Sequence, residues 1–130
     1  MRDAPVILIA DDDVGFQEIV ATTLKRNGFL VAEAHDGKEA VEKAVNLKPD
    51  LIIMDLNMPG ENGTEAILDI EQNPETKDMK IIFLTSETDP WPALKGEAKD
   101  VAKEIGAREF LNKADDLSKI VERVKELLKQ

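Results

Sequence analysis

The amino-acid sequence predicts an α/β fold, a five-stranded parallel sheet that is doubly wound by helices in a (βα)5 arrangement. Five short apolar runs alternate with five segments that favour helices, and this alternation is typical of a parallel sheet with helices on both faces. Polar residues directly follow most of the apolar runs, as expected where strands end at one edge of a sheet. The 130 residues have the size of one domain, which we expect to span residues 1–130 without an output domain.

The first unit is a strand followed by a helix. Val6–Ala10 is an apolar run too short for a helix with its own face, and it leads directly into the three aspartates Asp11–Asp13. Apolar residues at helical spacing, Ile19 among them, then occupy Phe16–Leu24. Gly28 suits the left-handed position that follows a helix. The segment therefore predicts a strand, an acidic turn and a helix.

The second unit repeats this pattern. Phe29–Ala34 predicts a strand, and Asp36 opens a helix with Glu39 three residues further on, as in a capping box. The buried face of this helix is expected to contain Ala40, Val41, Ala44 and Leu47.

The third strand is the element around which the candidate site is predicted. Leu51–Met54 runs without a polar break into Asp55, and a Pro-Gly turn follows at 59–60. Such a run is typical of a central strand buried on both faces. Because burying an unpaired charge is costly, we expect Asp55 to lie at the rim of the sheet, where open α/β sheets bind ligands.

The remaining segments complete the alternation. A helix through Ala66–Ile70 is expected to end near Asn73, and Lys80–Leu84 predicts the fourth strand. The stretch Glu87–Lys95, with Trp91 between two prolines, predicts a long loop. A fourth helix, a fifth strand and a last helix are expected at 96–105, 107–111 and 115–128.

Composition excludes several classes of protein. The absence of cysteine excludes disulfides, thiol catalysis and cysteine-bound zinc, and the single histidine, His35, excludes a multi-histidine metal site. A net charge of -10 opposes binding to nucleic acid or anionic membranes. The chain has no apolar run of membrane-spanning length and no apolar N-terminal stretch like that of a signal peptide. We therefore expect a cytoplasmic protein.

The polar residues after the strands predict one site, because the C-terminal ends of parallel strands share an edge. They are Asp11, Asp12, Asp13, Asp55, Thr85, Ser86 and Lys113. Several carboxylates in one cleft repel one another, and their hard oxygen ligands favour Mg²⁺. Mg²⁺, the ammonium group of Lys113 and the hydroxyl of Thr85 could together stabilise a phosphoryl group. Asp55 is then either its nucleophile or a metal ligand.

Four motifs, taken together, carry a resemblance to a known family. They are Ile7–Asp13 (Ile-Leu-Ile-Ala-Asp-Asp-Asp), Ile52–Gly60 (Ile-Ile-Met-Asp-Leu-Asn-Met-Pro-Gly), Phe83–Ser86 (Phe-Leu-Thr-Ser) and Phe110–Lys113 (Phe-Leu-Asn-Lys). In this order they resemble the receiver domains of two-component response regulators, and the resemblance covers the chain from Val6 to Leu128. It implies the flavodoxin-like fold of CheY-like proteins.

The resemblance also implies roles for individual residues. Asp55 would accept a phosphoryl group from a sensor histidine kinase or a histidine phosphotransfer protein. Asp12 would bind Mg²⁺ directly and Asp11 mainly through water. Asp55 and the main-chain carbonyl of Asn57 would be further ligands, and Mn²⁺ could replace Mg²⁺. Lys113 would pair with the phosphoryl oxygens.

The same resemblance implies a switch. Thr85 would move toward the phosphoryl group while Phe110 turns inward, although Phe110 could equally be a plain core residue. Glu87 and Asn57 occupy positions that tune dephosphorylation, and Ser86 adjoins them. The output surface would be formed by the fourth helix, fifth strand and fifth helix, for a downstream protein that the sequence does not identify.

Two features depart from the family pattern. Ala114 follows Lys113 where the family usually has a proline in a cis peptide, and a cis bond before a non-proline residue is costly. The segment from Thr85 to Lys113 is several residues longer than usual, with the excess expected around Trp91.

Other functions remain open beside the signalling module. The aspartates Asp11–Asp13 could merely cap a helix, and Asp13 is the one most suited to that role. A Mg²⁺-dependent aspartyl-phosphate hydrolase needs a second aspartate where Asn57 stands. A flavin carrier would need a phosphate-binding loop rich in serine, threonine and glycine after the first strand, where this chain has three aspartates. A receiver-like scaffold without phosphorylation is the main alternative. We expect no enzymatic activity beyond slow self-catalysed phosphorylation and dephosphorylation.

Overall fold

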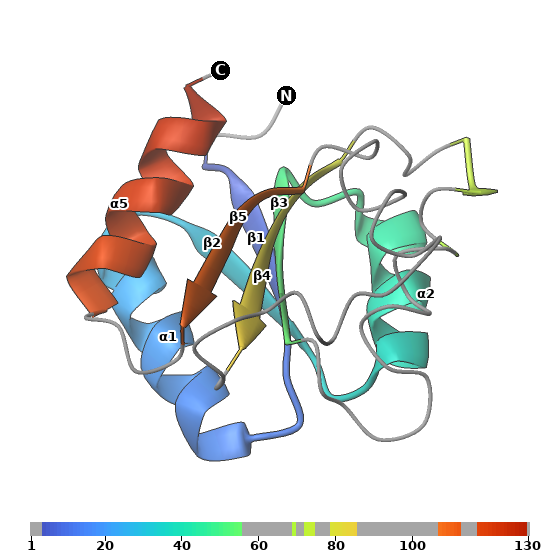
Figure 1. Ribbon diagram of the computed structural model, residues 1–130, viewed down its shortest axis with the longest axis horizontal. Helices are drawn as coiled ribbons and strands as arrows, with labels where there is room; N and C mark the ends of the chain where they lie inside the picture. Colours follow the sequence, from blue (N-terminus) through green and yellow to red (C-terminus); the bar gives the residue numbers. More distant parts are fainter. Residues whose placement is uncertain are drawn as a thin grey trace.

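Five parallel strands form a single sheet in the order β2-β1-β3-β4-β5 (Figure 1). The computed structural model describes residues 4–55, 69, 72–74, 79–85, 107–112 and 117–129. The strands are β1 (Val6–Ala10), β2 (Leu30–Ala34), β3 (Leu51–Asp55), β4 (Lys80–Thr85) and β5 (Ala107–Asn112). The helices with defined bounds are α1 (Val14–Arg26), α2 (Gly37–Leu47) and α5 (Leu117–Leu128). The predicted parallel, doubly wound sheet is confirmed.

The helices lie on both faces of the sheet. Figure 1 shows α1 and α5 on one side and α2 on the other. In α5, the apolar residues recur every three or four positions and are buried against the sheet and α1: Ile120, Val121, Val124 and Leu127. The Lys80 ammonium at the start of β4 donates a hydrogen bond to the Leu127 carbonyl at 2.6 Å. One hydrophobic core therefore lies between the sheet and the α1–α5 layer.

The central strand β3 is buried along its whole length, as predicted. Residues Leu51–Met54 are completely buried. The chain runs from β1 to β2 on one side and then crosses to β3 on the other side of β1. The gap between the C-terminal ends of β1 and β3 is thus the point where the strand order reverses, and this is where open α/β sheets bind ligands.

The predicted helix caps are confirmed. The Asp13 carboxylate accepts a hydrogen bond from the Phe16 amide at 3.1 Å and caps α1. Gly28, just beyond the end of α1, has the positive φ of 90° that favours glycine. The Asp36 carboxylate accepts from the Glu39 amide at 2.8 Å and caps α2. Local polar residues therefore fix where both helices begin.

Two apolar side chains lie on the surface although the pattern placed them with the buried residues. Ile19 in α1 is 54% exposed and Leu47 in α2 is 40% exposed. The buried face of α1 instead contains Gln17, Ala21 and Leu24. Ile19 comes two residues after Gln17, and in an α-helix this spacing places it on the opposite side. Leu47 is the last residue of its helix, just before the chain returns to the sheet at Leu51.

Part of the predicted architecture lies outside the described residues. Asp69 and Gln72 are helical and a bend follows at Asn73, which agrees with a third helix that ends there. The fourth helix and the loop around Trp91 lie outside the described ranges. Within those ranges, no helix has the length and apolar character needed to cross a lipid bilayer.

Candidate functional site

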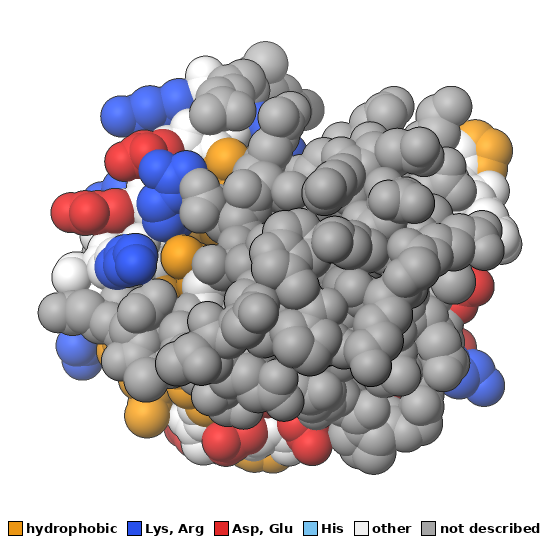
Figure 2. All heavy atoms as spheres, in the orientation of Figure 1, with side chains coloured by type: hydrophobic (Ala, Val, Ile, Leu, Met, Phe, Trp, Pro, Cys, Tyr) orange, Lys and Arg blue, Asp and Glu red, His pale blue; other side chains and the backbone are white. Residues whose placement is uncertain are grey.

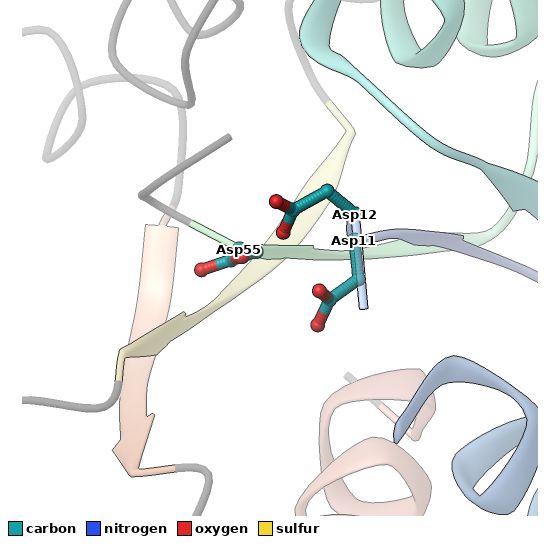
Figure 3. A group of neighbouring side chains, drawn as sticks. All are labelled: Asp11, Asp12 and Asp55. Atoms are coloured by element: carbon teal, nitrogen blue, oxygen red, sulfur yellow. The ribbon is translucent and has the colours of Figure 1, made fainter. Parts of the chain in front are cut away.

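Three aspartates gather at the C-terminal ends of β1 and β3. Carboxylate oxygens of Asp11, Asp12 and Asp55 lie within 4.8 Å of one another. Figure 3 shows the side chains projecting from the ends of these two neighbouring strands. The strand register explains the arrangement, because Ala10 pairs with Met54, so that the next residues, Asp11 and Asp55, stand level. The cluster predicted from the sequence is thus formed by the described residues.

The three carboxylates differ in burial. Asp11 is 0% exposed and Asp55 is 4% exposed, whereas Asp12 is exposed. Asp55 ends its strand, as predicted, and its side chain is buried there. Like charges repel strongly where water is excluded. A cation is the natural means of offsetting this repulsion.

The donor set fits a hard divalent cation. All three side chains offer carboxylate oxygens, and Mg²⁺ prefers such ligands, usually one or two carboxylates together with water. His35, by contrast, is exposed and bonds to Glu39, as expected for a residue without a role in the site. Among the described residues, no other group of three acidic or histidine side chains is placed to hold a metal.

The third aspartate of the acidic turn has a structural role. Its main-chain amide donates to Oδ1 of Asp11 at 2.8 Å, and its own carboxylate caps α1. The amide of Asp11 donates to the Ala34 carbonyl at 3.0 Å. Asp13 therefore caps the helix, as predicted, and also orients the side chain of Asp11.

Sequence analysis missed one buried polar residue near the cluster. Gln17 is 1% exposed, and its Nε2 group donates to the carbonyls of Ile9 and Ala34, both at 2.8 Å. The sequence does contain a signal for its burial. Gln17 stands three positions before Val20 and four before Ala21, a spacing that places it on the same face of the helix as these apolar residues.

The sheet register places Thr85 at the same edge and Phe110 two residues before the end of β5. Asp55 pairs with Leu84, and the next residue, Thr85, pairs with Asn112. Phe110 pairs with Phe83 on the neighbouring strand. The backbone thus brings the ends of β3, β4 and β5 side by side. Four predicted site residues lie outside the described ranges, as does the Lys113–Ala114 peptide bond: Asn57, Ser86, Glu87 and Lys113.

A family model for the response regulator receiver domain matches residues 7–125. The match includes every strand from β2 to β5 and the acidic cluster. The chain belongs to this family.

Curated relatives of this receiver domain include transcriptional regulators. It is 29% identical to the phosphate regulon transcriptional regulatory protein PhoB of Escherichia coli (strain K12), over 95% of this chain and 52% of that protein. It is 31% identical to the DNA-binding dual master transcriptional regulator RpaA of Synechocystis, over 97% of this chain and 50% of that protein. The receiver domain spans about half the length of these relatives.

Solved structures share the fold of this receiver domain. A putative response regulator from Chloroflexus aurantiacus is 31% identical with a TM-score of 0.84, over 98% of this chain and 100% of that one. The chemotaxis response regulator CheY4 of Vibrio cholerae is 30% identical with a TM-score of 0.82, over 95% of this chain and 98% of that one. The CheY-like fold that the motifs implied is therefore confirmed. Receiver domains of response regulators are phosphorylated by histidine kinases, so the family also indicates the class of upstream partner.

Proposed function

We propose that this receiver domain accepts a phosphoryl group on Asp55 from the phosphohistidine of a sensor histidine kinase or a histidine phosphotransfer protein. The observation that carries the proposal is the meeting of Asp11, Asp12 and Asp55 at the point where the strand order reverses. Phosphorylation would alter the binding of a downstream protein, in the cytoplasm.

Asp55 is the best placed of the three aspartates to be the acceptor. It ends the central strand at the point where the strand order reverses, whereas Asp11 and Asp12 belong to the acidic turn after β1. In the proposed transfer, a carboxylate oxygen of Asp55 forms a bond to phosphorus while the bond from phosphorus to the histidine nitrogen breaks. The electron pair of that bond leaves with the imidazole, and an acyl phosphate remains on Asp55.

The acidic cluster suits the Mg²⁺ that we propose for the reaction. Asp11, Asp12 and Asp55 would hold the ion together with the main-chain carbonyl of Asn57, and Mn²⁺ would be able to replace it. The bound cation would supply the positive charge that offsets the carboxylates and the phosphoryl oxygens. Holding two carboxylates at the end of β1 is therefore the contribution of the acidic turn.

The neighbouring strand ends would complete the site. We propose that Lys113 pairs with a phosphoryl oxygen and that the Thr85 hydroxyl donates to another. The register that pairs Thr85 with Asn112, the residue before Lys113, supports this placement. Phe110 would follow the movement of Thr85, and Glu87, beside Ser86, would tune the lifetime of the phosphorylated state.

A binding module fits better than an enzyme with its own substrate. The hydrolase alternative needs a second aspartate where the chain has Asn57. A receiver-like scaffold needs no acidic cluster, yet the described residues contain one with two buried members. The net charge of -10 opposes direct contact of these residues with nucleic acid, so the proposed output is a protein contact.

The experiment that tests this function measures intact-protein mass after incubation with acetyl phosphate, with and without MgCl₂. We expect a Mg²⁺-dependent gain of one phosphoryl group that is labile in alkali and absent in Asp55→Asn. Asp13→Asn is the matched control, because it removes the same charge while asparagine still caps the helix. The absence of any gain in the parent chain would favour the scaffold, and a gain retained in Asp55→Asn would place the acceptor elsewhere.

A further inference from the structure

Gln17 is the one buried polar side chain outside the acidic cluster among the described residues. The other two buried polar side chains are Asp11 and Asp55. Taking an amide out of water is costly unless its hydrogen-bonding groups find partners. Both hydrogens of the Gln17 amide are used, since Nε2 donates to the carbonyls of Ile9 and Ala34 at 2.8 Å each.

Gln17 bonds to both ends of the acidic turn, once through its side chain and once through its main chain. The side chain of Gln17 bonds to Ile9, two residues before Asp11. The main-chain amide of Gln17 donates to the Asp13 carbonyl at 3.0 Å. A single residue of α1 therefore brackets the segment 9–13, which carries the two β1 carboxylates of the cluster.

The bond to Ala34 also ties this segment to the neighbouring strand. The Ala34 carbonyl accepts from Gln17 and from the amide of Asp11, at 3.0 Å. Ala34 is the last residue of β2 and pairs with Ala10. The hydrogen bond from the Asp11 amide thus continues the β1–β2 ladder one residue beyond its last pair. Gln17 bonds to the same carbonyl, at the point where the chain leaves β1.

We propose that Gln17 is a positioning residue for metal binding and phosphoryl transfer. Through its side-chain bonds to Ile9 and Ala34, it fixes the main chain that leads into Asp11 and Asp12 and keeps their carboxylates in reach of Asp55. It touches neither the ion nor the phosphoryl group. The inference rests on the proposed function, because it assigns a support to the same site.

A purely structural role for Gln17 makes a different prediction. Loss of its hydrogen bonds would then lower the stability of the fold and leave the Mg²⁺ affinity of the folded protein unchanged. Positioning instead predicts weaker Mg²⁺ binding in protein that is still fully folded. Removing groups that orient metal ligands typically weakens metal binding about 10- to 100-fold.

The test compares Gln17→Met with Val20→Ala. Methionine has a similar length to glutamine and donates no hydrogen bond. Val20 is equally buried in the same helix, at 1% exposure, so its truncation controls for general destabilisation of α1. Should Gln17→Met fail to fold, Gln17→Ala replaces it, with folding checked by circular dichroism.

Three measurements are made on the folded variants. The Mg²⁺ dissociation constant is measured by calorimetry, the rate of phosphorylation by acetyl phosphate is followed against MgCl₂ concentration, and hydrogen exchange of the Asp11 amide is followed by NMR. For Gln17→Met we expect a rise of about tenfold in the dissociation constant. The MgCl₂ concentration for half-maximal rate should rise with it, while the rate at saturating Mg²⁺ changes far less. Exchange of the Asp11 amide should accelerate.

The outcomes separate this inference from the proposed function. If the parent chain binds Mg²⁺ and is phosphorylated, but Gln17→Met does so with the same dissociation constant as Val20→Ala, Gln17 has no positioning role and only the inference is overturned. If the parent chain neither binds Mg²⁺ nor is phosphorylated, the proposed function fails and the inference falls with it.

Discussion

At the scale of single residues, the candidate site is a balance of unfavourable charges. Asp11 and Asp55 are buried next to one another, and the exposed Asp12 lies close enough for all three to share a cation. Folding brings these carboxylates together, so each one raises the electrostatic cost of folding in the absence of a cation. A site of this kind lowers the stability of the metal-free protein and at the same time raises its affinity for a cation.

Neutralising Asp12 should therefore stabilise the metal-free protein. In the presence of EDTA, we expect Asp12→Asn to raise the free energy of unfolding by about 0.5–1 kcal/mol, the repulsion expected near a protein surface after screening by water. Urea unfolding followed by circular dichroism measures the change. Asp13→Asn removes an equal charge one residue away and should have a smaller effect. Equal effects of the two variants would show that the cluster adds no specific repulsion.

At the scale of elements, the start of α2 shows how a cap depends on charge. The main-chain amide of His35 donates to Oε1 of Glu39 at 2.6 Å. This hydrogen bond, helped by the Lys43 ammonium at 3.7 Å from Oε2 and opposed by partial burial, lowers the pKa of Glu39 below its usual value of 4.5. The charged form of Glu39 is therefore favoured in the folded protein over the unfolded chain.

The sign of this pKa change gives a pH dependence. Because the pKa of Glu39 is lower in the folded state, its contribution to stability is present above the unfolded value of 4.5 and is lost as the pH falls through the folded value. We expect Glu39→Gln to lower stability at pH 7 by at most about 0.5 kcal/mol, because water screens this partly exposed group. The difference should vanish in acid.

Urea unfolding between pH 7 and pH 3 measures this dependence. Glu42→Gln is the control, since Glu42 is an exposed glutamate of the same helix. A difference between parent and Glu39→Gln that stays constant down to the lowest pH would contradict the assigned role of Glu39.

The elements also show what a pattern of residues can predict. The strands and the caps at Asp13 and Asp36 were predicted, because short apolar runs and capping residues act locally. Ile19 and Leu47 were placed wrongly on buried faces, since the direction of a helix stripe depends on packing that spacing alone does not fix. The role of Gln17 was not predicted, because its hydrogen-bond partners lie on two different strands and are brought to it only by folding.

At the scale of the whole molecule, topology makes the site. Asp11 and Asp55 are far apart in sequence and meet only because β1 and β3 are neighbouring parallel strands. Alternation of strands and helices was enough to predict this shared edge. The burial of the Asp55 side chain was not predictable, because it depends on tertiary packing that the pattern of residues along the chain does not determine.

The net charge of -10 is a second property of the whole chain. It is not spread evenly. Figure 2 shows basic side chains among acidic ones over α5. The exposed charged residues of this helix are Lys119, Glu122, Lys125 and Glu126. The excess of negative charge therefore lies elsewhere in the chain, and part of it is concentrated in the acidic cluster.

Two kinds of salt effect should follow from this distribution. Self-repulsion of a chain with net charge -10 is weakened by any salt, so NaCl should raise the unfolding temperature gradually. Mg²⁺ bound only by the folded state adds a further stabilisation that grows with the logarithm of its concentration and reaches about 2.7 kcal/mol at 100 times its dissociation constant. Thermal unfolding in MgCl₂ and in NaCl at matched ionic strength separates the two effects.

Asp12→Asn distinguishes the specific effect from the general one. We expect this variant to lose most of the increment given by MgCl₂ while it keeps the response to NaCl, because general screening needs no particular carboxylate. Asp13→Asn should keep both responses. Identical unfolding temperatures in the two salts for the parent chain would mean that the three carboxylates bind no cation in the folded state, and the proposed phosphoacceptor chemistry would then lack the positive charge it requires.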